Sequence, residues 1–302
     1  MEMFNFENLT ILSVEKYIIH TIFSKILARY TANILRCSAV RCFKRKETIM
    51  STQWNIMRLR GGDTPRKKTG MFGNAKAAED MLVTYWSFAV WNDEHKIIVD
   101  CGVNEEDEMP WYTPTLNHVP REQKLPAQLA FIGWQPEDVD TVIFTHLHYD
   151  HTGYAYLFKN AKFFVQRKEY EAGMNEAQKG YFAFYKRANY DKKAIRYSSW
   201  RFLDGETEIY PGLMAIPTPG HAVGHQSVLV DTAEGAVCIT GDAVNVKFAL
   251  DNNVTHGLPL HDGIAQLNSY EKIRQIADRV ATAHDEESDE VYDHQTDGFP
   301  LV

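Results

Sequence analysis

The stretch "VIFTHLHYDH" at residues 142–151 constrains the chain most, because it joins an apolar run directly to four side chains that can bind metals. The apolar, β-branched run that leads into it is typical of a buried strand. Successive side chains of a strand alternate between its two faces, so His146 and His148 share one side and can hold one ion. Asp150 and His151 follow where the chain turns away. Four ligands in so short a stretch favour two ions, since a single ion would be crowded by all of them.

Two ions need further ligands, and other predicted elements end in suitable residues. His221 follows a strand and a Pro-Gly turn in "PTPGHAVGH", and Asp242 ends an apolar strand in "CITGDA". His284 follows the last predicted helix in "ATAHDE". A buried strand that delivers a carboxylate after a glycine suits a ligand shared by two ions, which favours Asp242. An ordinary turn aspartate is the alternative for Asp242 taken alone.

Strand-like and helix-like segments are interspersed from about residue 80 onward. Runs of β-branched and aromatic residues bounded by turn residues predict strands, and apolar residues at helical spacing predict helices. Their order predicts two sheets covered on the outside by helices. The predicted strands span 81–91, 96–102, 140–146, 161–166, 212–220, 226–232 and 235–243, and the predicted helical segments span 120–133, 167–190 and 269–280.

The first 79 residues differ in character from the rest of the chain. Residues 1–49 are basic, with apolar residues at helical spacing, and are predicted to be an N-terminal extension outside the core. A presequence or a membrane-surface helix is the alternative. Residues 50–79 are interpreted as a linker or the start of the domain, in which "GGDTPRKK" is typical of a flexible linker. Residues 80–302 form the predicted catalytic domain.

Charge and cysteine usage limit the partners and the compartment. Residues 1–68 contain 13 Lys and Arg against 5 Asp and Glu, whereas the whole chain has a net charge of −8, so the remainder is strongly acidic. An acidic body argues against a nucleic-acid partner. No apolar run reaches the roughly 20 residues of a membrane span. The four cysteines form no CxxC pair, which favours a reducing, cytoplasmic location.

Taken together, HxHxDH, PGHxxGH, Gly-Asp and a late histidine resemble the metal signature of the metallo-β-lactamase superfamily across roughly residues 80–290. The resemblance implies an α/β fold, an αββα sandwich of two mixed β-sheets flanked by helices, with a two-metal site at the edge of the sheets. It assigns His146, His148 and His221 to one ion, Asp150, His151 and His284 to the other, and Asp242 to a bridge between them. Imidazoles and carboxylates without a thiolate favour Zn²⁺, with Fe²⁺, Co²⁺ or Mn²⁺ as alternatives.

Two more residues are predicted to support the ligands. Asp100 ends the strand "IIVDCG" and matches the aspartate of the superfamily's DTG-like turn. We expect it to accept a hydrogen bond from a metal-bound histidine. His225 is expected to brace the "PGHAVGH" turn. For both residues, hydrogen bonding within the local turn is an equal alternative.

Within the superfamily the chain resembles N-acyl-homoserine lactonases, through "HLHYDHTG", "FFVQRKEYEA" and "IPTPGHAVGHQSVLV". This resemblance implies a metal-dependent hydrolase of the quorum-quenching type that opens a small lactone. One ion would polarise the carbonyl group, a bridging hydroxide would attack it, and Asp150 would pass a proton to the leaving oxygen. Those lactonases usually carry a tyrosine three residues after the bridging aspartate, where this chain has Asn245. Asn245 is therefore a candidate substrate contact with a shorter reach.

The aromatic insert and the shared ligand motif leave alternatives open. Six rings either line an acyl pocket or pack the insert onto the body, and packing is favoured. These rings are Phe182, Phe184, Tyr185, Tyr190, Tyr197 and Trp200. A glyoxalase II-like thioesterase, an arylesterase or a β-lactamase is the alternative activity, and a metal-binding protein without turnover is a minor one. The predicted partner is a small lactone or ester, and a homodimer is one candidate for the oligomeric state.

Overall fold

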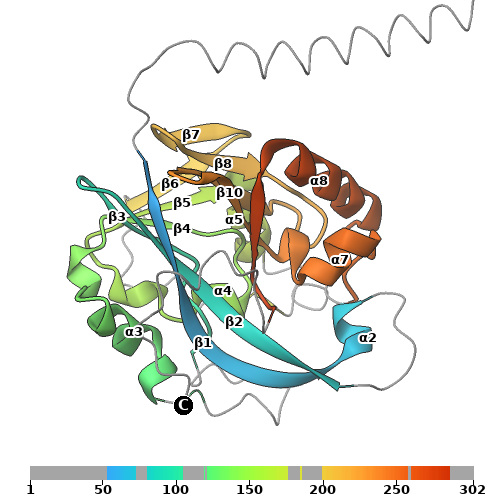
Figure 1. The fold of residues 1–302 in the computed structure, drawn as a ribbon, viewed down its shortest axis with the longest axis horizontal. Coiled ribbons are helices and arrows are strands. Elements are labelled where there is room, and N and C mark those ends of the chain that lie inside the picture. Colours follow the sequence, from blue (N-terminus) through green and yellow to red (C-terminus); the bar gives the residue numbers. More distant parts are fainter. Residues whose placement is uncertain are drawn as a thin grey trace, which may run out of the picture. The chain divides into compact units, whose positions relative to one another are not determined.

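In the computed structural model the described residues are 53–72, 80–104, 119, 121–175, 184–185, 199–257 and 260–285, and they build two β-sheets (Figure 1). Among these residues the first sheet has the order β1 (Asn55–Lys67), β2 (Asp80–Trp91), β3 (Lys96–Val99), β4 (Thr141–Ile143), β5 (Lys162–Gln166) and β6 (Trp200–Leu203). The second has the order β11 (Arg279–Thr282), β10 (Gly235–Gly241), β9 (Gln226–Thr232), β8 (Leu213–Pro217) and β7 (Thr207–Tyr210). Both sheets are mixed, since β3 to β6 are parallel and β11 is parallel to β10, while the other pairs are antiparallel.

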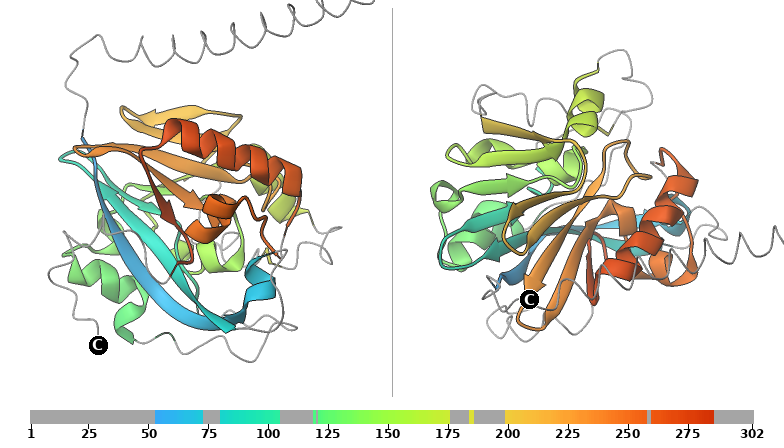
Figure 2. Two further views of the ribbon diagram at one scale, coloured as in Figure 1. Left: turned by 45° about the vertical axis from the view of Figure 1, so that its right-hand side comes forward. Right: turned by 90° about the horizontal axis from the view of Figure 1, so that it is seen from above.

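Helices lie on the outer side of each sheet (Figure 2). The helix α3 (Leu125–Phe131) packs with the first sheet, and α7 (Lys247–Asn252) and α8 (Gly263–Ile276) pack with the second. The remaining helical segments are α2 (Lys68–Met71), η1 (Arg121–Gln123), η2 (Pro136–Asp138), α4 (Tyr149–Thr152), η3 (Ala155–Leu157), α5 (Arg167–Met174) and η6 (Asp242–Val244). Within the described part of the chain, every helix is too short or too polar to cross a membrane.

Neighbouring residues of the strands serve opposite faces of each sheet. Phe88 and Val90 of β2 belong to the apolar cluster between the two sheets, whereas Ala89 belongs to the cluster under α3. Likewise Val237 of β10 faces the first sheet, while Cys238 packs against the layer of α7 and α8. This period-two division of apolar residues buries both faces of each sheet. The predicted αββα sandwich is therefore confirmed.

The prediction that "GGDTPRKK" is a flexible linker is wrong, because residues 61–67 continue β1 and Lys68 begins α2. Its register against β2 shifts between Arg60 and Asp63, where the two glycines lie. Gly62 has a φ of +100°, which side chains rarely adopt, so the glycines accommodate a β-bulge rather than a loop. The Arg60 guanidinium bonds the Asp63 carboxylate at 2.7 Å across this bulge. The described residues of the region 50–79 belong to the same compact unit as the other described residues.

The last predicted helix begins earlier and ends earlier than the sequence pattern indicated. Asp262 caps α8, its Oδ1 accepting from the backbone N–H groups of Ile264 and Ala265 at 2.9 and 3.0 Å. Residues 279–280, predicted as helix, belong to β11 instead, because they pair with Val237 and Cys238 of β10. The predicted extension 1–49 lies outside the described residues, as does most of the aromatic insert.

Candidate metal centre

Polar residues follow the strand ends and meet at one edge of the sandwich. His146 comes three residues after β4, Asp242 directly follows β10, and His284 comes two residues after β11. His221 lies in the turn between β8 and β9. Parallel strands bring their carboxyl ends to the same edge of a sheet, which is where ligand sites collect in such folds.

Three imidazoles form the first group. The Nε2 atom of His146 and the Nε2 atom of His221 each lie 3.0 Å from Nδ1 of His148. All three side chains are buried. Three nitrogen atoms that converge in this way can direct their lone pairs at one ion, and such a group is a typical divalent-metal site.

The second group joins Asp150, His151 and His284. Oδ2 of Asp150 lies 3.9 Å from Nε2 of His151 and 3.8 Å from Nε2 of His284. The two imidazoles are buried, whereas the Asp150 side chain is 14 % exposed. Asp150 therefore combines a place among the ligands with access to the outside of the centre.

The Asp242 carboxylate lies between the two groups. Its Oδ1 atom is 3.3 Å from Nε2 of His151 and 3.1 Å from Nε2 of His284, and its Oδ2 atom is 3.3 Å from Nε2 of His221. The preceding Gly241 has a φ of +52°, and a Cβ there would lie 2.6 Å from Thr145. Glycine is thus required at the turn that delivers Asp242. Each oxygen faces one group, as a bridging ligand requires.

The donor atoms of these groups suit bound ions. Nε2 of His151 and Oδ1 of Asp242 are buried without a hydrogen-bond partner, although isolating such atoms from water is costly. Ligand atoms within each group lie within 4.8 Å of one another. Imidazole nitrogen and carboxylate oxygen are ligands of Zn²⁺ and of neighbouring first-row ions. The residues therefore fit two divalent ions.

Electrostatics separate the imidazoles of the two groups. Burial holds the pKa of His146, His148 and His221 well below that of a free imidazole, so these rings are neutral, as metal ligands must be. Burial acts on His151 in the same direction, but nearby carboxylates, with Asp100 foremost, outweigh it and raise the pKa of His151. The second group is thus built to favour positive charge.

Asp100 contacts the ring of His151, where it can orient a metal-bound histidine. Its Oδ2 atom lies 2.8 Å from Nδ1 of His151, and its Oδ1 atom accepts from the backbone N–H of Thr145 at 2.8 Å. The Thr145 hydroxyl donates to Asp100 and lies 3.1 Å from Nδ1 of His146. Nδ1 of His284 lies 2.9 Å from the Thr84 carbonyl oxygen. These contacts leave Nε2 of each ring free to face an ion.

Comparison with known proteins agrees with this arrangement. Residues 82–284 match the model of the metallo-beta-lactamase superfamily. The chain belongs to this superfamily. It is 30% identical to the N-acyl homoserine lactonase AiiA of Bacillus thuringiensis subsp. kurstaki, over 56% of this chain and 67% of the relative. The predicted enzyme class, a metal-dependent hydrolase of ester bonds, is confirmed.

Solved structures of the superfamily share the fold. One is an N-acyl homoserine lactone hydrolase with the product N-hexanoyl-L-homoserine bound at its catalytic metal center, with a TM-score of 0.66 and 23% identity over 78% of this chain and 95% of that chain. Another is AidC, a dizinc quorum-quenching lactonase in complex with a product, with a TM-score of 0.58 and 18% identity over 79% of this chain and 90% of that chain. This chain therefore shares its fold with a lactonase that holds two zinc ions.

His225 connects the "PGHAVGH" turn to the turn after β10. Its Nδ1 atom lies 3.0 Å from the Thr218 hydroxyl, and its Nε2 atom accepts from the backbone N–H of Ala243 at 3.2 Å. Ala243 directly follows Asp242, so the ring ties the "PGHAVGH" turn to the residue between the two groups. Burial lowers the pKa of His225 to about 3, which keeps the ring neutral.

Glu169 of α5 is a supporting residue that sequence reasoning missed. Its buried carboxylate accepts from the backbone N–H of Leu147 at 3.0 Å, from the backbone N–H of Gly224 at 2.9 Å, and from the Tyr185 hydroxyl at 2.8 Å. Leu147 lies between His146 and His148, so one carboxylate holds both histidine-bearing turns. The only signal in the sequence was its place within "VQRKEYEA".

Asn245 is not placed as a substrate contact. The side chain is completely buried. Its Nδ2 atom donates to the Met71 carbonyl oxygen at 3.1 Å, and its Oδ1 atom accepts from the backbone N–H of Val246 at 3.0 Å. The backbone N–H of His284 donates to the Asn245 carbonyl oxygen at 2.9 Å. The amide therefore fastens α2 to the turn after β10 and does not reach into the centre.

The aromatic rings of the insert divide between the two interpretations. Trp200 packs inside the core beside Phe144 and Phe163, as expected of a packing residue. Phe184 and Tyr185 lie against His148, with ring centroids at 5.6 and 4.8 Å. These two rings thus form a wall of the metal centre. Phe182, Tyr190 and Tyr197 lie outside the described residues.

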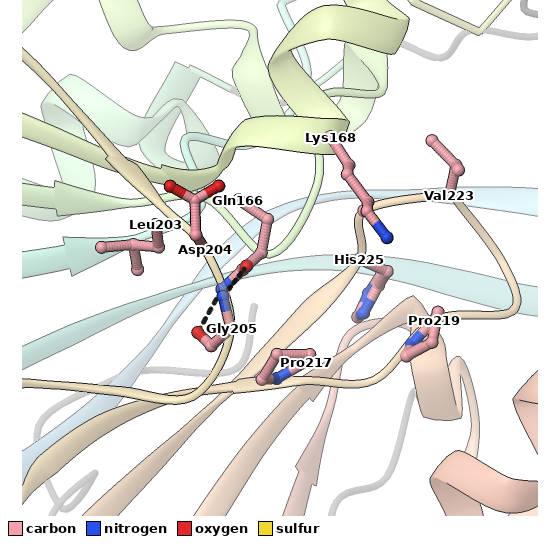
Figure 3. A pocket seen from close by; sticks show the side chains of 10 residues that line it. Gln166, Lys168, Leu203, Asp204, Gly205, Pro217, Pro219, Val223 and His225 are labelled. Carbon is pink, nitrogen blue, oxygen red and sulfur yellow. Dashed lines mark hydrogen bonds between the residues drawn. The ribbon is translucent and has the colours of Figure 1, made fainter.

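A cavity of about 330 Å³ is lined in part by the "PGHAVGH" turn (Figure 3). His225 lines it, but none of the seven predicted ligands does, and Lys168 and Val223 stand on the same side of it in the figure. Its lining residues are Gln166, Lys168, Leu203, Asp204, Gly205, Pro217, Pro219, Val223, Gly224 and His225. This cavity borders the supports of the centre rather than the centre itself.

Proposed function

We propose that the chain is a dinuclear metal-dependent lactonase that opens the ring of N-acyl homoserine lactones or similar small lactones. The observation that carries the proposal is the Asp242 carboxylate, whose two oxygens face two separate ligand groups. The sequence relationship to named lactonases supports the choice of substrate. In this proposal His146, His148 and His221 hold one ion, Asp150, His151 and His284 hold the other, and Asp242 is shared.

Two divalent ions bound there would supply a hydroxide nucleophile at neutral pH and a Lewis acid for the lactone carbonyl group, with zinc as the expected metal. The chain's own residues would orient the ligand histidines and exclude water from part of the centre. Asp100, Thr145 and Thr84 fix the rings of the ligand histidines, so that the ligand atoms are held in place before substrate binds. Phe184 and Tyr185 shield the His148 side from water.

Asp150 is the residue we assign to proton transfer. It is the most exposed of the seven predicted ligands, and its carboxylate lies beside the imidazoles of His151 and His284. From this position it can hold a proton and deliver it to the ring oxygen that leaves as the lactone opens. The product is then an N-acyl homoserine with a free hydroxyl and a carboxylate.

The cysteines of the described region do not offer a competing nucleophile. Cys101 and Cys238 are both buried. Burial raises the pKa of Cys101 well above its usual value and that of Cys238 to about 12, so neither forms a thiolate at neutral pH. This supports attack by water rather than by a side chain.

A substrate panel on the zinc-loaded protein tests the proposal. The panel contains N-hexanoyl homoserine lactone, γ-butyrolactone, a glutathione thioester, phenyl acetate and a cephalosporin, with acid release followed by a pH indicator. We expect the homoserine lactone to give the highest kcat/KM. If the lactones stay intact while the thioester, the aryl ester or the cephalosporin is hydrolysed, the lactonase proposal fails and the corresponding alternative replaces it. Metal binding without any hydrolysis would support the non-catalytic alternative.

A further inference from the structure

His256 is a buried histidine that the seven-residue ligand set does not include. His256 belongs to the segment that joins α7 to α8, and only 3 % of the residue is exposed. Both ring nitrogens are buried without a hydrogen-bond partner. A buried imidazole normally satisfies at least one of its nitrogens, because burying an unpaired polar group is costly. Packing alone therefore does not explain why a histidine is buried at this position.

The backbone of His256 is held beside Asp242. Its N–H donates to Oε1 of Gln266 at 2.9 Å, and Nε2 of the same amide donates to the Ala243 carbonyl oxygen at 3.2 Å. Gln266 is completely buried on α8. One amide thus connects His256 to the residue that directly follows Asp242.

A second connection fastens the same segment to the His221 turn. The backbone N–H groups of His261 and Asp262 both donate to the Gly220 carbonyl oxygen, at 2.9 and 2.8 Å. Gly220 directly precedes His221. The segment that carries His256 is therefore tied to both turns that deliver ligands, and its place does not depend on the ring of His256.

The ring of His256 faces the first ligand group. Its centroid lies 4.8 Å from that of His221, with the planes at 61°. A nitrogen of His256, a nitrogen of His221 and a carboxylate oxygen of Asp242 lie within 4.8 Å of one another, which is the same limit as in the two ligand groups described above. His221 and Asp242 already meet at the first group, where Nε2 and Oδ2 are 3.3 Å apart.

We propose that His256 is a further ligand of the ion held by His146, His148 and His221, so that four imidazoles and Asp242 surround it. The proposal rests on the two-metal centre proposed above and is independent of the substrate. It explains why an imidazole is buried at this point with both nitrogens unpaired. It also predicts that this ion is bound more tightly than the ion at Asp150, His151 and His284.

The test uses His256→Phe, which keeps a planar ring without a ligand atom. His261→Phe is the matched control, since His261 lies in the same segment and is exposed. Zinc affinity is measured by competition with a chromophoric chelator, and the visible d–d band is recorded after loading with cobalt. Circular dichroism and the thermal midpoint of the metal-free proteins report whether the fold is kept.

We expect His256→Phe to lower the zinc affinity of the tighter of the two sites by more than 100-fold and to change the intensity of the cobalt band. We expect His261→Phe to change neither. Loss of a residue that only supports a ligand costs 10–100-fold, so a loss in that range with an unchanged band would overturn direct ligation. Unchanged affinity would overturn the proposal as well. If the wild-type chain itself binds fewer than two ions, the proposed centre fails first, which separates the two failures.

X-ray absorption on the wild-type protein decides the matter even if His256→Phe does not fold. At one zinc per chain the proposal predicts about four imidazole ligands around the metal. A count of three or fewer would contradict it.

Discussion

Removal of the Glu169 carboxylate should loosen both histidine-bearing turns at once. The carboxylate accepts from two buried backbone N–H groups, those of Leu147 and Gly224, and from the Tyr185 hydroxyl. In Glu169→Ala the two N–H groups lose their acceptor, at about 1–3 kcal/mol each. We therefore expect the free energy of unfolding to fall by about 2–6 kcal/mol.

Glu169→Gln tests the charge and the geometry separately. One amide oxygen can still accept from Leu147 or from Gly224, but the amide nitrogen then faces the other N–H donor. Glu169→Gln should therefore lower the free energy of unfolding by half as much as Glu169→Ala, roughly 1–3 kcal/mol. Because Leu147 separates His146 from His148, zinc affinity should also fall by about 10–100-fold.

Urea unfolding of the metal-free proteins measures the change in the free energy of unfolding without the stabilisation that bound zinc adds. Chelator competition measures the change in zinc affinity. Glu171→Gln is the control, because Glu171 lies on the same helix and is exposed. If Glu169→Gln and Glu171→Gln share one unfolding midpoint and one zinc affinity, Glu169 does not hold the turns.

Substitutions at Asp100, Asp150 and His225 test other parts of the candidate centre. Asp100→Asn should weaken zinc binding by about 10–100-fold in a chelator titration, because His151 loses the carboxylate that orients it. Asp150→Asn should lower kcat for the lactone by about 10²–10⁴-fold, while the exposed control Asp93→Asn leaves kcat unchanged. The folded pKa of His225 is about 3 against 6.5 when unfolded, so stability is lost as pH falls below 6.5. Between pH 7 and pH 5 the metal-free wild type should lose about 2 kcal/mol more than His225→Gln in urea unfolding.

Much of the candidate centre could be predicted because each candidate ligand lies next to a feature that is visible in the local sequence. A buried strand followed by His146 and His148 needs no distant partner to be noticed, and Asp242 directly follows β10 in the same way. The apolar, β-branched runs likewise predicted buried strands. Since both features depend on neighbours along the chain, they are visible in the sequence.

The features that were missed depend on contacts between distant residues. Glu169 looks like an ordinary helix residue, and its partner Gly224 lies 55 positions away. Residues 279–280 continue a helical pattern, but pairing with β10 makes them a strand. The two glycines near Asp63 are typical of a linker until β2 is placed beside them. Asn245 was expected at the substrate because lactonases usually carry a tyrosine at this position. Its hydrogen bond to Met71 of α2 leaves no trace in the local sequence.

Lactone hydrolysis measured against the zinc content of the chain tests the central claim most directly. Metal-free protein is titrated with zinc, and the initial rate on N-hexanoyl homoserine lactone is recorded at each step. Since two ligand groups share Asp242, we predict that the rate rises to a plateau at about two zinc ions per chain. A plateau at one ion, or no hydrolysis at any zinc content, would contradict a dinuclear lactonase.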